Sequence, residues 1–376
     1  MERLTVRPVR NKRELKQFIL FPWKVYKGDP NWVPPLIVDM KEMLDKRKNP
    51  FFQHSDAEFF LARRGDEVVG RIAAIQNNRH NEFHQEKTGF FGFFEVLRDY
   101  EAAAALFDAA AAWLADRGLT LMRGPMNYST NDTVGFLLEG FDKPPVVLMT
   151  YNPPYYLEFC QRYGFQKAKD LYAYLMTADQ PLPEKTIRVA EAVKRRENLE
   201  FRPVNMRRFW DEVDLVFQIY NDAWSLNWGF VPLTREEIDH IAKQLKMIID
   251  PDLVLIALIN GEPAGFSLAL PDVNQALIRI RNGRLLPFGL PKLLWYMRKI
   301  NGIRVFTMGV VRKYQKRGID ALFYVETYRR GVAKGHRWGE FSWILEDNVM
   351  MNRAAESLGA RVYKRYRVYE KPIAQA

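Results

Sequence analysis

The turn at residues 315–318, Gln-Lys-Arg-Gly, has the residue types and the spacing that suit an anion. An apolar run precedes it, and a helical pattern follows it. A strand that delivers a turn to a helix N-terminus presents backbone amides without internal partners, and the helix dipole adds partial positive charge. Gly318 permits a tight backbone approach, while Lys313, Lys316 and Arg317 add charge. The turn therefore predicts an anion site, with an ordinary basic surface turn as the alternative.

The formal net charge of the 376-residue chain is +11, and the excess is concentrated in one region. Between Asp272 and Asp320 the sequence has no acidic residue. Such a region attracts phosphates, anionic lipid or nucleic acid, and the alternative is a solvated basic surface without a partner. Nucleic acid is disfavoured because the aromatic residues do not form an RNA-stacking motif. The basic residues of the region are Arg279, Arg281, Arg284, Lys292, Arg298, Lys299, Arg304, Arg312, Lys313, Lys316 and Arg317.

The chain contains an internal repeat with an offset of 195 residues. Residues 6–9 (VRPV) are echoed by 201–204 (FRPV), and Gly70 has a glycine counterpart at the same offset. Widely spaced matches at one offset are typical of duplicated domains. A proline-containing polar stretch separates the copies. We therefore predict two domains, residues 1–178 and 179–376.

Each copy follows the same succession of predicted elements. A strand and a helix are followed by a hairpin, an apolar strand, a helix, another strand, a helix and a closing β-segment. The apolar strand is 90–96 in the first copy and 304–310 in the second. We expect an α/β fold in which each domain is a mixed, twisted sheet flanked by helices.

The second copy resembles the GNAT acyltransferase superfamily in its acyl-CoA-binding motif. In that motif a strand runs into Gln/Arg-x-x-Gly-x-Gly/Ala and then into a helix. Gln315 and Gly318 occupy the first two defined positions, whereas Asp320 stands where the family has Gly or Ala. Residues 342–370 also resemble the family's last conserved region. The resemblance covers both halves and implies a tandem GNAT protein.

The first copy departs from the motif. It lacks the glycine turn and has Asp99 and Glu101 near the expected phosphate site. We therefore expect acyl-CoA or acetyl-CoA, the co-substrate that the resemblance implies, to bind only the second domain, without a metal. The cofactor-binding set implied by the resemblance is Met308, Val310, Val311, Gln315, Lys316, Arg317, Gly318, Ile319 and Asn348.

Acyl transfer from a thioester to an amine needs a group that takes a proton from the amine and a donor for the oxyanion. Glu346 lies at the end of an apolar strand, and we expect it to accept the amine proton through water. Its alternative role is helix capping. The resemblance implies Tyr363 as the proton donor to the departing thiolate, with an ordinary strand tyrosine as the alternative.

The first domain offers two histidines and a carboxylate as further catalytic candidates. His80 and His84 have i, i+4 spacing, but a third ligand at motif spacing is missing, which disfavours a metal site. The two histidines are the second choice for the base. Glu95 is either a cleft carboxylate or a strand-end charge.

A run of hydrogen-bonding side chains follows the next predicted strand. Asn127, Ser129 and Asn131 belong to it. They are candidates for contacts with the acyl acceptor, and an Asx-rich turn is the alternative.

Residues 284–300 interleave Leu, Phe, Trp and Met with Arg and Lys. This composition is typical of a helix in a membrane interface, although two prolines restrict the helix to the later half. It indicates that the acyl donor or the acyl acceptor is apolar. The chain is also similar to the tandem GNAT group proposed to act as bacterial ceramide synthases, which N-acylate a sphingoid base with a long-chain acyl-CoA.

We therefore expect a CoA-dependent N-acyltransferase for an amine, with a lipid or sphingoid-base amine as the finer expectation. The alternatives are an acetyltransferase for a small amine or peptide, and a non-catalytic GNAT-fold binding protein. The sequence shows neither a signal-peptide pattern nor a stretch of roughly 18 apolar residues. Its one cysteine, Cys160, cannot form an internal disulfide. These features predict a cytoplasmic protein, and residues 284–300 suggest peripheral association with the inner face of the membrane.

Overall fold

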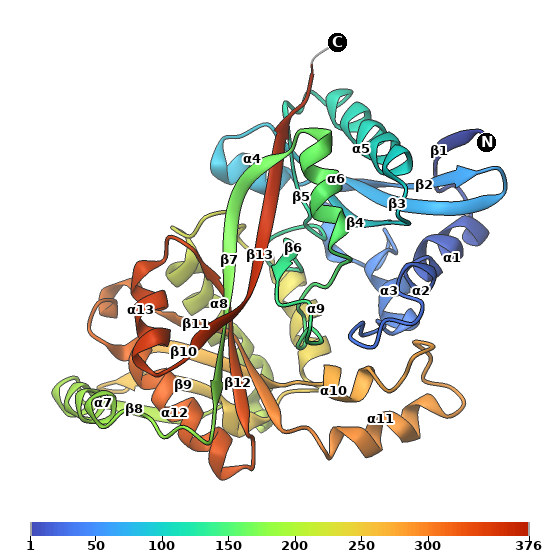
Figure 1. Cartoon of the computed structure of the whole chain (residues 1–376). Coiled ribbons are helices and arrows are strands. Elements are labelled where there is room, and N and C mark those ends of the chain that lie inside the picture. Colours follow the sequence, from blue (N-terminus) through green and yellow to red (C-terminus); the bar gives the residue numbers. More distant parts are fainter. Residues whose placement is uncertain (1, 375–376) are drawn as a thin grey trace. The chain divides into compact units, whose positions relative to one another are not determined.

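The computed structural model describes residues 2–374, which form two compact units (Figure 1). The N-terminal unit contains the residues up to Asp170, together with Leu277–Leu293 and the residues from Tyr366 onward. The C-terminal unit contains Leu171–Ala276 and Leu294–Arg365. Two segments from the second half of the sequence thus belong to the first unit. The bounds 1–178 and 179–376 stay a prediction for the duplicated copies.

The sheet of the N-terminal unit has the strand order β1-β2-β3-β4-β5-β13, and β6 also pairs with β13. Neighbouring strands along this order are antiparallel, except that β4 and β5 are parallel. The strands are β1 (Leu4–Pro8), β2 (Asp56–Arg64), β3 (Glu67–Gln76), β4 (Thr88–Val96), β5 (Leu121–Gly124), β6 (Phe136–Glu139) and β13 (Arg361–Pro372).

The sheet of the C-terminal unit has the corresponding order β8-β9-β10-β11-β12-β7. Its one parallel pair, among the described residues, is β11 with β12, which matches the place of β4 and β5. The strands are β7 (Gln166–Thr177), β8 (Leu199–Pro203), β9 (Val254–Ile259), β10 (Glu262–Pro271), β11 (Gly302–Val310) and β12 (Trp338–Leu345). The mixed α/β fold predicted from the repeat is confirmed.

Each sheet ends on a strand from the other copy. Leu171–Thr177 of β7, which follows the first copy in the sequence, lie in the C-terminal unit and pair with β12. Tyr369–Pro372 of β13, the last strand of the second copy, pair with β5 in the N-terminal unit. A cut at the linker would therefore remove a strand from each sheet.

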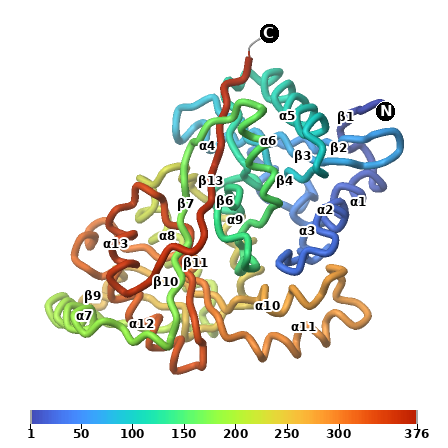
Figure 2. Tube along the Cα trace, viewed as in Figure 1, coloured from blue at the N-terminus to red at the C-terminus, as the bar shows by residue number. Residues whose placement is uncertain are grey.

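Helices flank both sheets. The N-terminal unit has α1 (Lys12–Leu20), α2 (Pro22–Val25), α3 (Ile37–Met43), the 3-10 helix η1 (Pro50–Gln53), α4 (Asn78–His84), α5 (Tyr100–Ala115) and α6 (Tyr155–Tyr163). The C-terminal unit has α7 (Glu184–Arg196), η2 (Met206–Arg208), α8 (Phe209–Trp224), α9 (Arg235–Leu245), η3 (Pro251–Leu253), η4 (Arg312–Tyr314), α12 (Ile319–Ala333) and α13 (Val349–Ser357). Two short helices, α10 (Asn274–Leu277) and α11 (Gly289–Met297), lie on the orange trace of Figure 2.

The repeated glycines have the same packing role in both units. A Cβ atom on Gly70 of β3 would lie 2.6 Å from Leu106 of α5, and one on Gly265 of β10 would lie 3.1 Å from Phe323 of α12. The missing side chain thus lets a helix pack closely on the sheet. The duplication preserves this contact, which explains the glycine matches in the sequence.

Helices α8 and α12 cover opposite faces of the C-terminal sheet. Alternate residues of a strand point to opposite faces. Ile256 of β9 packs in one apolar cluster with Ile219 of α8, whereas Leu255 packs in another cluster with Phe323 of α12. Within residues 2–374, none of the helices has both the length and the apolar character needed to cross a membrane.

Candidate active site

The parallel strands β11 and β12 separate halfway along their length. Their register pairs Gly302–Val305 with Trp338–Phe341 and ends there, although both strands continue. Beyond this point the two strands form the sides of a wedge in the sheet.

Both strands are bulged where they separate. Phe306 is an extra residue of β11 opposite β10, because Leu268 faces Thr307 and the next residue of β10 faces Val305. On β12 the register against β7 shifts between Phe341 and Ile344. Bulges bend a strand and redirect its side chains. They therefore help to open the wedge.

A pocket of about 590 Å³ fills the wedge. Its wall includes Ala223 and Trp224 at the end of α8, and Gly318, Ile319 and Asp320 at the start of α12. Since these two helices cover opposite faces of the sheet, the pocket passes between the strands from one face to the other. An elongated ligand can occupy such a pocket with its two ends on opposite faces.

The predicted anion turn lies at one end of this pocket. Gly318 is the N-cap of α12 with φ +83°, and Lys316 has φ +62°. A residue other than glycine with positive φ is uncommon and is held in place by its surroundings. Among the described residues, side chains make no capping hydrogen bond to the N-terminus of α12. The first amides of the helix are therefore available to an anion.

Most of the predicted cofactor-binding residues line the pocket. Val311 and Arg317 are outside its wall, and the cofactor-binding role of the whole set stays a prediction. The predicted residues in the wall are Met308, Val310, Gln315, Lys316, Gly318, Ile319 and Asn348.

Two of the basic side chains of the turn have partners elsewhere. Lys313 Nζ lies 3.0 Å from Glu262 Oε2, and Arg317 Nη1 lies 3.0 Å from Glu197 Oε2. Lys316 lines the pocket and forms no ion pair within residues 2–374. The positive side chains that line the pocket are those of Arg312 and Lys316.

Two polar residues of the wall also stabilise the local backbone. Gln315 Nε2 donates to the carbonyl of Val310 at 3.0 Å and so ties the turn to the end of β11. Asn348 Oδ1 accepts from the Met351 amide at 3.2 Å as the N-cap of α13. Asp320, in the first turn of α12, brings a carboxylate to the same end of the pocket.

The predicted proton-transfer residues lie outside the pocket wall. Glu346 follows β12, and its carbonyl accepts from Asn352 Nδ2 at 3.3 Å. Tyr363, on β13, donates its hydroxyl hydrogen to Glu340 Oε2. Both roles stay predictions.

A buried polar network connects Tyr363 to the pocket, and sequence reasoning missed it. Ser342, which lines the pocket, donates from Oγ to Glu340 Oε1. Arg304 donates from Nε to Ser342 Oγ at 3.0 Å and from Nη2 to the Ser342 carbonyl at 3.1 Å. Arg304, Glu340 and Ser342 are all buried. The sequence signal for this network was the presence of the charged residues Arg304 and Glu340 within otherwise apolar strands.

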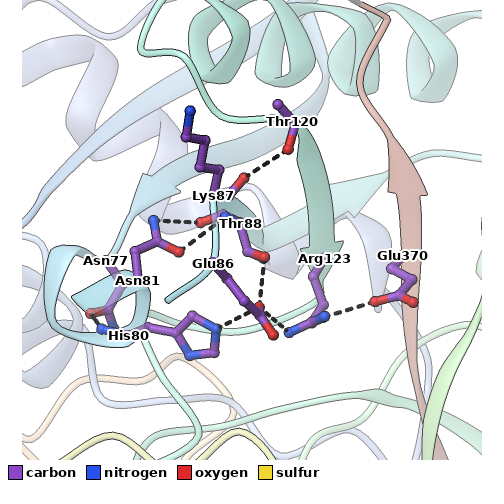
Figure 3. A network of polar contacts seen from close by, with 9 residues as sticks. All are labelled: Asn77, His80, Asn81, Glu86, Lys87, Thr88, Thr120, Arg123 and Glu370. Atoms are coloured by element: carbon purple, nitrogen blue, oxygen red, sulfur yellow. Dashed lines mark hydrogen bonds and ion pairs between the residues drawn. The ribbon is translucent and has the colours of Figure 1, made fainter. Parts of the chain in front are cut away.

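In the N-terminal unit, His80 belongs to a second polar network (Figure 3). It is buried, and its Nε2 lies 3.2 Å from Glu86 Oε2, which also lies 3.3 Å from Arg123 Nη1. Burial lowers the pKa of His80 to about 4, so its ring is neutral at pH 7. The His84 ring lies 4.5 Å from that of His80. Within residues 2–374, His, Cys, Asp and Glu side chains form no group of three that could hold a metal ion.

Glu95 lies in a buried cluster of hydroxyl donors. The hydroxyls of Tyr26 and Tyr156 donate to its Oε2 at 2.9 and 2.8 Å. Arg71 Nη2 lies 3.9 Å from its Oε1. Burial raises the pKa of Glu95 to about 7.

The wedge between β4 and β5 in the N-terminal unit is occupied by the chain itself. Asn127 Oδ1 accepts from the Phe93 amide at 2.8 Å, and the Tyr156 hydroxyl accepts from the Val96 amide at 2.8 Å. A Cβ atom on Gly92 would lie 2.0 Å from the Met126 carbonyl oxygen, so the segment after β5 packs directly on β4.

The helix that corresponds to α12 is capped by a carboxylate. Asp99 Oδ1 accepts from the Ala102 amide at 3.1 Å, and Asp99 Oδ2 lies 2.7 Å from Arg64 Nε. The hydrogen bond from Arg64 lowers the pKa of Asp99, which therefore stays charged at neutral pH. The N-terminus of α5 thus already has an internal anion.

The residues predicted to contact the acceptor make turn contacts. Asn127 Nδ2 donates to Thr133 Oγ1 at 2.6 Å. Ser129 Oγ donates to Asp132 Oδ2 at 3.1 Å and accepts from the Asn131 amide at 3.0 Å. Recognition of an acceptor by these residues stays a prediction.

Two curated proteins are similar to the chain over nearly its whole length. One, from Caulobacter vibrioides, is named bacterial ceramide synthase and is 41% identical over 380 residues, with 98% of each chain covered. The other, protein YghO of Escherichia coli K12, is 39% identical over 376 residues, with 98% of this chain and 95% of that protein covered. No protein-family model matches the sequence.

Solved structures share the fold. The tandem GNAT protein from the clavulanic acid biosynthesis pathway has a TM-score of 0.58 at 14% identity, with 100% of both chains covered. A GCN5-related N-acetyltransferase from Sphaerobacter thermophilus has a TM-score of 0.52 at 15% identity, with 98% of this chain and 96% of that chain covered.

Proposed function

We propose that the chain moves an acyl group from acyl-CoA to an amine. It belongs to the family of the Caulobacter protein named bacterial ceramide synthase, and it has the fold of a tandem GNAT protein. The observation that supports this proposal most is the uncapped N-terminus of α12, which opens into a pocket that crosses the sheet. An acyl-CoA carries its diphosphate far from its acyl group. The pocket can hold the diphosphate at the α12 end and the thioester between the strands.

The difference between the corresponding helix N-termini of the two copies supports acyl-CoA binding in the C-terminal unit. There the helix amides and Lys316 are available. In the N-terminal unit Asp99 caps the corresponding helix, and a diphosphate would meet that carboxylate. Like charges in contact are unfavourable. We therefore infer one acyl-CoA site per chain.

A lipid amine is the acceptor class that we propose. The Caulobacter relative's name supports a sphingoid base. Exposed apolar side chains in the pocket wall support a greasy ligand, since Leu226 is 84% and Met350 is 60% exposed. Exposed apolar residues that gather at an opening often mark a binding surface.

The reaction needs a proton acceptor for the amine and a proton donor for the thiolate. Glu346 after β12 and Tyr363 on β13 are the candidates from the sequence, and both are in the C-terminal unit. His80, His84 and Glu95 are further candidates in the N-terminal unit. Each of these residues is replaced by its neutral or apolar analogue. The loss of acyl-transfer rate ranks the residues as catalytic candidates, and acyl-CoA affinity is measured separately as the control.

The test is acyl transfer with the purified full-length chain. We expect palmitoyl-CoA and sphinganine to give an N-acyl product detectable by mass spectrometry. Acetylation of a small amine, with no lipid product, would favour the small-amine acetyltransferase. Binding of acyl-CoA without turnover of either pair would favour a non-catalytic GNAT-fold protein.

Residues 284–300 are the proposed contact with an anionic membrane surface. Phe288 is 82% and Trp295 is 58% exposed, and α11 has no buried residue among those described. Lys299 Nζ lies 5.0 Å from the centre of the Trp295 ring, so cationic and aromatic groups are adjacent. Exposed apolar groups mixed with basic ones, without acidic residues, suit the interface of an anionic bilayer.

A further inference from the structure

A second cavity lies on the face of the C-terminal sheet that α12 covers. Its volume is about 30 Å³. Residues of β7, β11 and β12 line it from the sheet, and Tyr324, Thr327 and Gly331 line it from α12. All of these elements belong to the C-terminal unit. A cavity of this volume has room for about two groups of the size of water.

The small cavity adjoins the main pocket. The two share three lining residues, Val305, Tyr324 and Phe341. Val305 and Phe341 are the last residues that pair β11 with β12, so they lie at the closed end of the wedge. Gly339, in the paired part of β12, lines the small cavity only. The small cavity therefore continues the wedge beyond its closed end, away from Gly318 at the start of α12.

Packing alone holds the Tyr324 side chain between the two cavities. The rings of Tyr324 and Phe341 are in edge-to-face contact, with their centres 4.7 Å apart. Tyr324 is buried, and its hydroxyl has no hydrogen-bond partner within residues 2–374. Side-chain rotamers often change when a ligand binds. Movement of this ring would join the small cavity to the main pocket.

The lining of the small cavity is mostly apolar. Met176, Ile303 and Phe341 belong to the apolar cluster between α12 and the sheet. Two polar atoms in lining residues, Thr327 Oγ1 and His336 Nδ1, have no hydrogen-bond partner among the described residues. A threonine in a helix can turn its hydroxyl to the carbonyl one turn earlier, so Thr327 does not require a polar ligand. Apolar cavities bind apolar groups.

Resting on the proposed function, we propose that the small cavity receives the end of the donor's acyl chain and limits its length. The proposed function has the diphosphate at the start of α12 and the thioester between β11 and β12, so the donor lies along the α12 face. The acyl carbons beyond the thioester then reach the closed end of the wedge, where Val305 and Phe341 adjoin the small cavity. The α8 end of the main pocket is left to the acceptor amine.

The test measures kcat/KM of the full-length chain for sphinganine with a series of donors from acetyl-CoA to palmitoyl-CoA. Thr327→Leu fills the cavity, and Ala333→Leu adds bulk to an exposed site on α12 as the control. We expect Thr327→Leu to lower kcat/KM about tenfold or more for the donor that the wild type prefers, the size of effect that one methylene has in an apolar pocket. Its preferred donor should have a shorter chain, while acetyl-CoA is used as well as by the wild type. Ala333→Leu should keep the wild-type preference.

Two further variants separate filling of the cavity from other effects. Gly331→Ala adds one methyl group, whose carbon would lie 3.2 Å from Ile303 Cδ1, and should shift the preference in the same direction by less. It serves also if Thr327→Leu does not fold, since overpacking destabilises a core. Thr327→Val keeps the volume and removes the hydroxyl, so the wild-type preference should remain. A loss in Thr327→Val as large as that in Thr327→Leu would mean a polar occupant and overturn the proposal.

An unchanged donor preference in both filling variants, or an equal loss with every donor, would also overturn it. A changed dependence on the chain length of the acceptor would place the acceptor in the cavity instead. Calorimetry with CoA and palmitoyl-CoA gives a readout without turnover, because Thr327→Leu should weaken binding of palmitoyl-CoA but not of CoA. Absence of acyl transfer by the wild type with every donor would count against the proposed function, and this binding difference would still test the cavity.

Discussion

At the scale of single residues, Gly318 is where conformation and proposed binding coincide. Its φ of +83° is a left-handed conformation that costs other residues about 1 kcal/mol or more. A Cβ atom there would point toward Val193 of α7 at 3.3 Å rather than into open space. The effect of a substitution should therefore come from displacement of the turn and its amides, not from blockage of the pocket.

We expect Gly318→Ala to weaken acyl-CoA binding about tenfold or more, because the displaced amides no longer point at the diphosphate. A tenfold weaker Kd corresponds to about 1.4 kcal/mol of binding free energy. Gly335→Ala is the matched control, since Gly335 has φ +86° and a Cβ there would have no neighbour within 4 Å. Titration calorimetry with CoA measures the affinity, and urea unfolding measures the cost of strain. Equal CoA affinity in the two variants would contradict a role for this turn.

Asp320 is the residue by which the turn departs from its family. Its carboxylate lies in the pocket wall at the N-terminus of α12. We expect Asp320→Asn to bind CoA more tightly, because it removes a negative charge beside the diphosphate. This gain in CoA affinity should shrink at high salt, because ions screen the repulsion between the carboxylate and the diphosphate. Weaker CoA binding by Asp320→Asn at low salt would show that the carboxylate assists the ligand.

At the scale of elements, β4 holds a carboxylate whose protonation affects stability. The folded protein keeps the Glu95 proton up to a pKa of about 7, whereas the unfolded chain releases it near 4.5. The unfolded state then binds fewer protons between these values, so stability from this group falls as the pH rises through them. Above about pH 7 its contribution is constant.

Glu95→Gln removes this dependence. We expect the free energy of unfolding of the variant, relative to that of the wild type, to rise between pH 5 and pH 8 by an amount on the order of 3 kcal/mol at most. Urea unfolding at both pH values measures it, with the exposed Glu82→Gln as the control for loss of one carboxylate. A relative stability that falls over this range would mean that Glu95 is ionised in the fold.

Contacts that are repeated in both copies could be predicted from the sequence. Contacts between side chains far apart in the sequence could not. The match between Gly70 and Gly265 could be recognised in the sequence, because a helix packs closely on the sheet at both positions. The cofactor role of Arg317 stays a prediction, and its contact with Glu197, 120 residues away in the sequence, could not be predicted. The link from Glu340 through Ser342 to the pocket depends on a bulge that no residue pattern announces.

At the scale of the whole molecule, the two copies have diverged in what occupies the same wedge. In the N-terminal unit Asn127, Tyr156 and Asp99 accept hydrogen bonds from the amides of Phe93, Val96 and Ala102. In the C-terminal unit the wedge holds the pocket. The repeat could be predicted from the sequence, whereas the exchange of β7 and β13 could not, because a strand's pattern does not specify which sheet it joins.

The membrane contact is a further prediction at this scale. We expect the full-length protein to sediment with vesicles that contain phosphatidylglycerol, and much less with phosphatidylcholine vesicles. The double variant Phe288→Ser, Trp295→Ser should lose this binding, whereas Trp210→Ser, at a site 39% exposed on α8, should keep it. Unchanged sedimentation of the double variant would place the lipid contact elsewhere.

The proposed function depends on the amides at the start of α12, which we expect to hold the diphosphate of acyl-CoA. A crystal structure of the chain with bound CoA tests it most directly. We expect diphosphate density against the amides that follow Gly318, with Lys316 nearby and the pantetheine arm between β11 and β12. Diphosphate bound at the start of α5, or anywhere outside the wedge of the C-terminal unit, would contradict it.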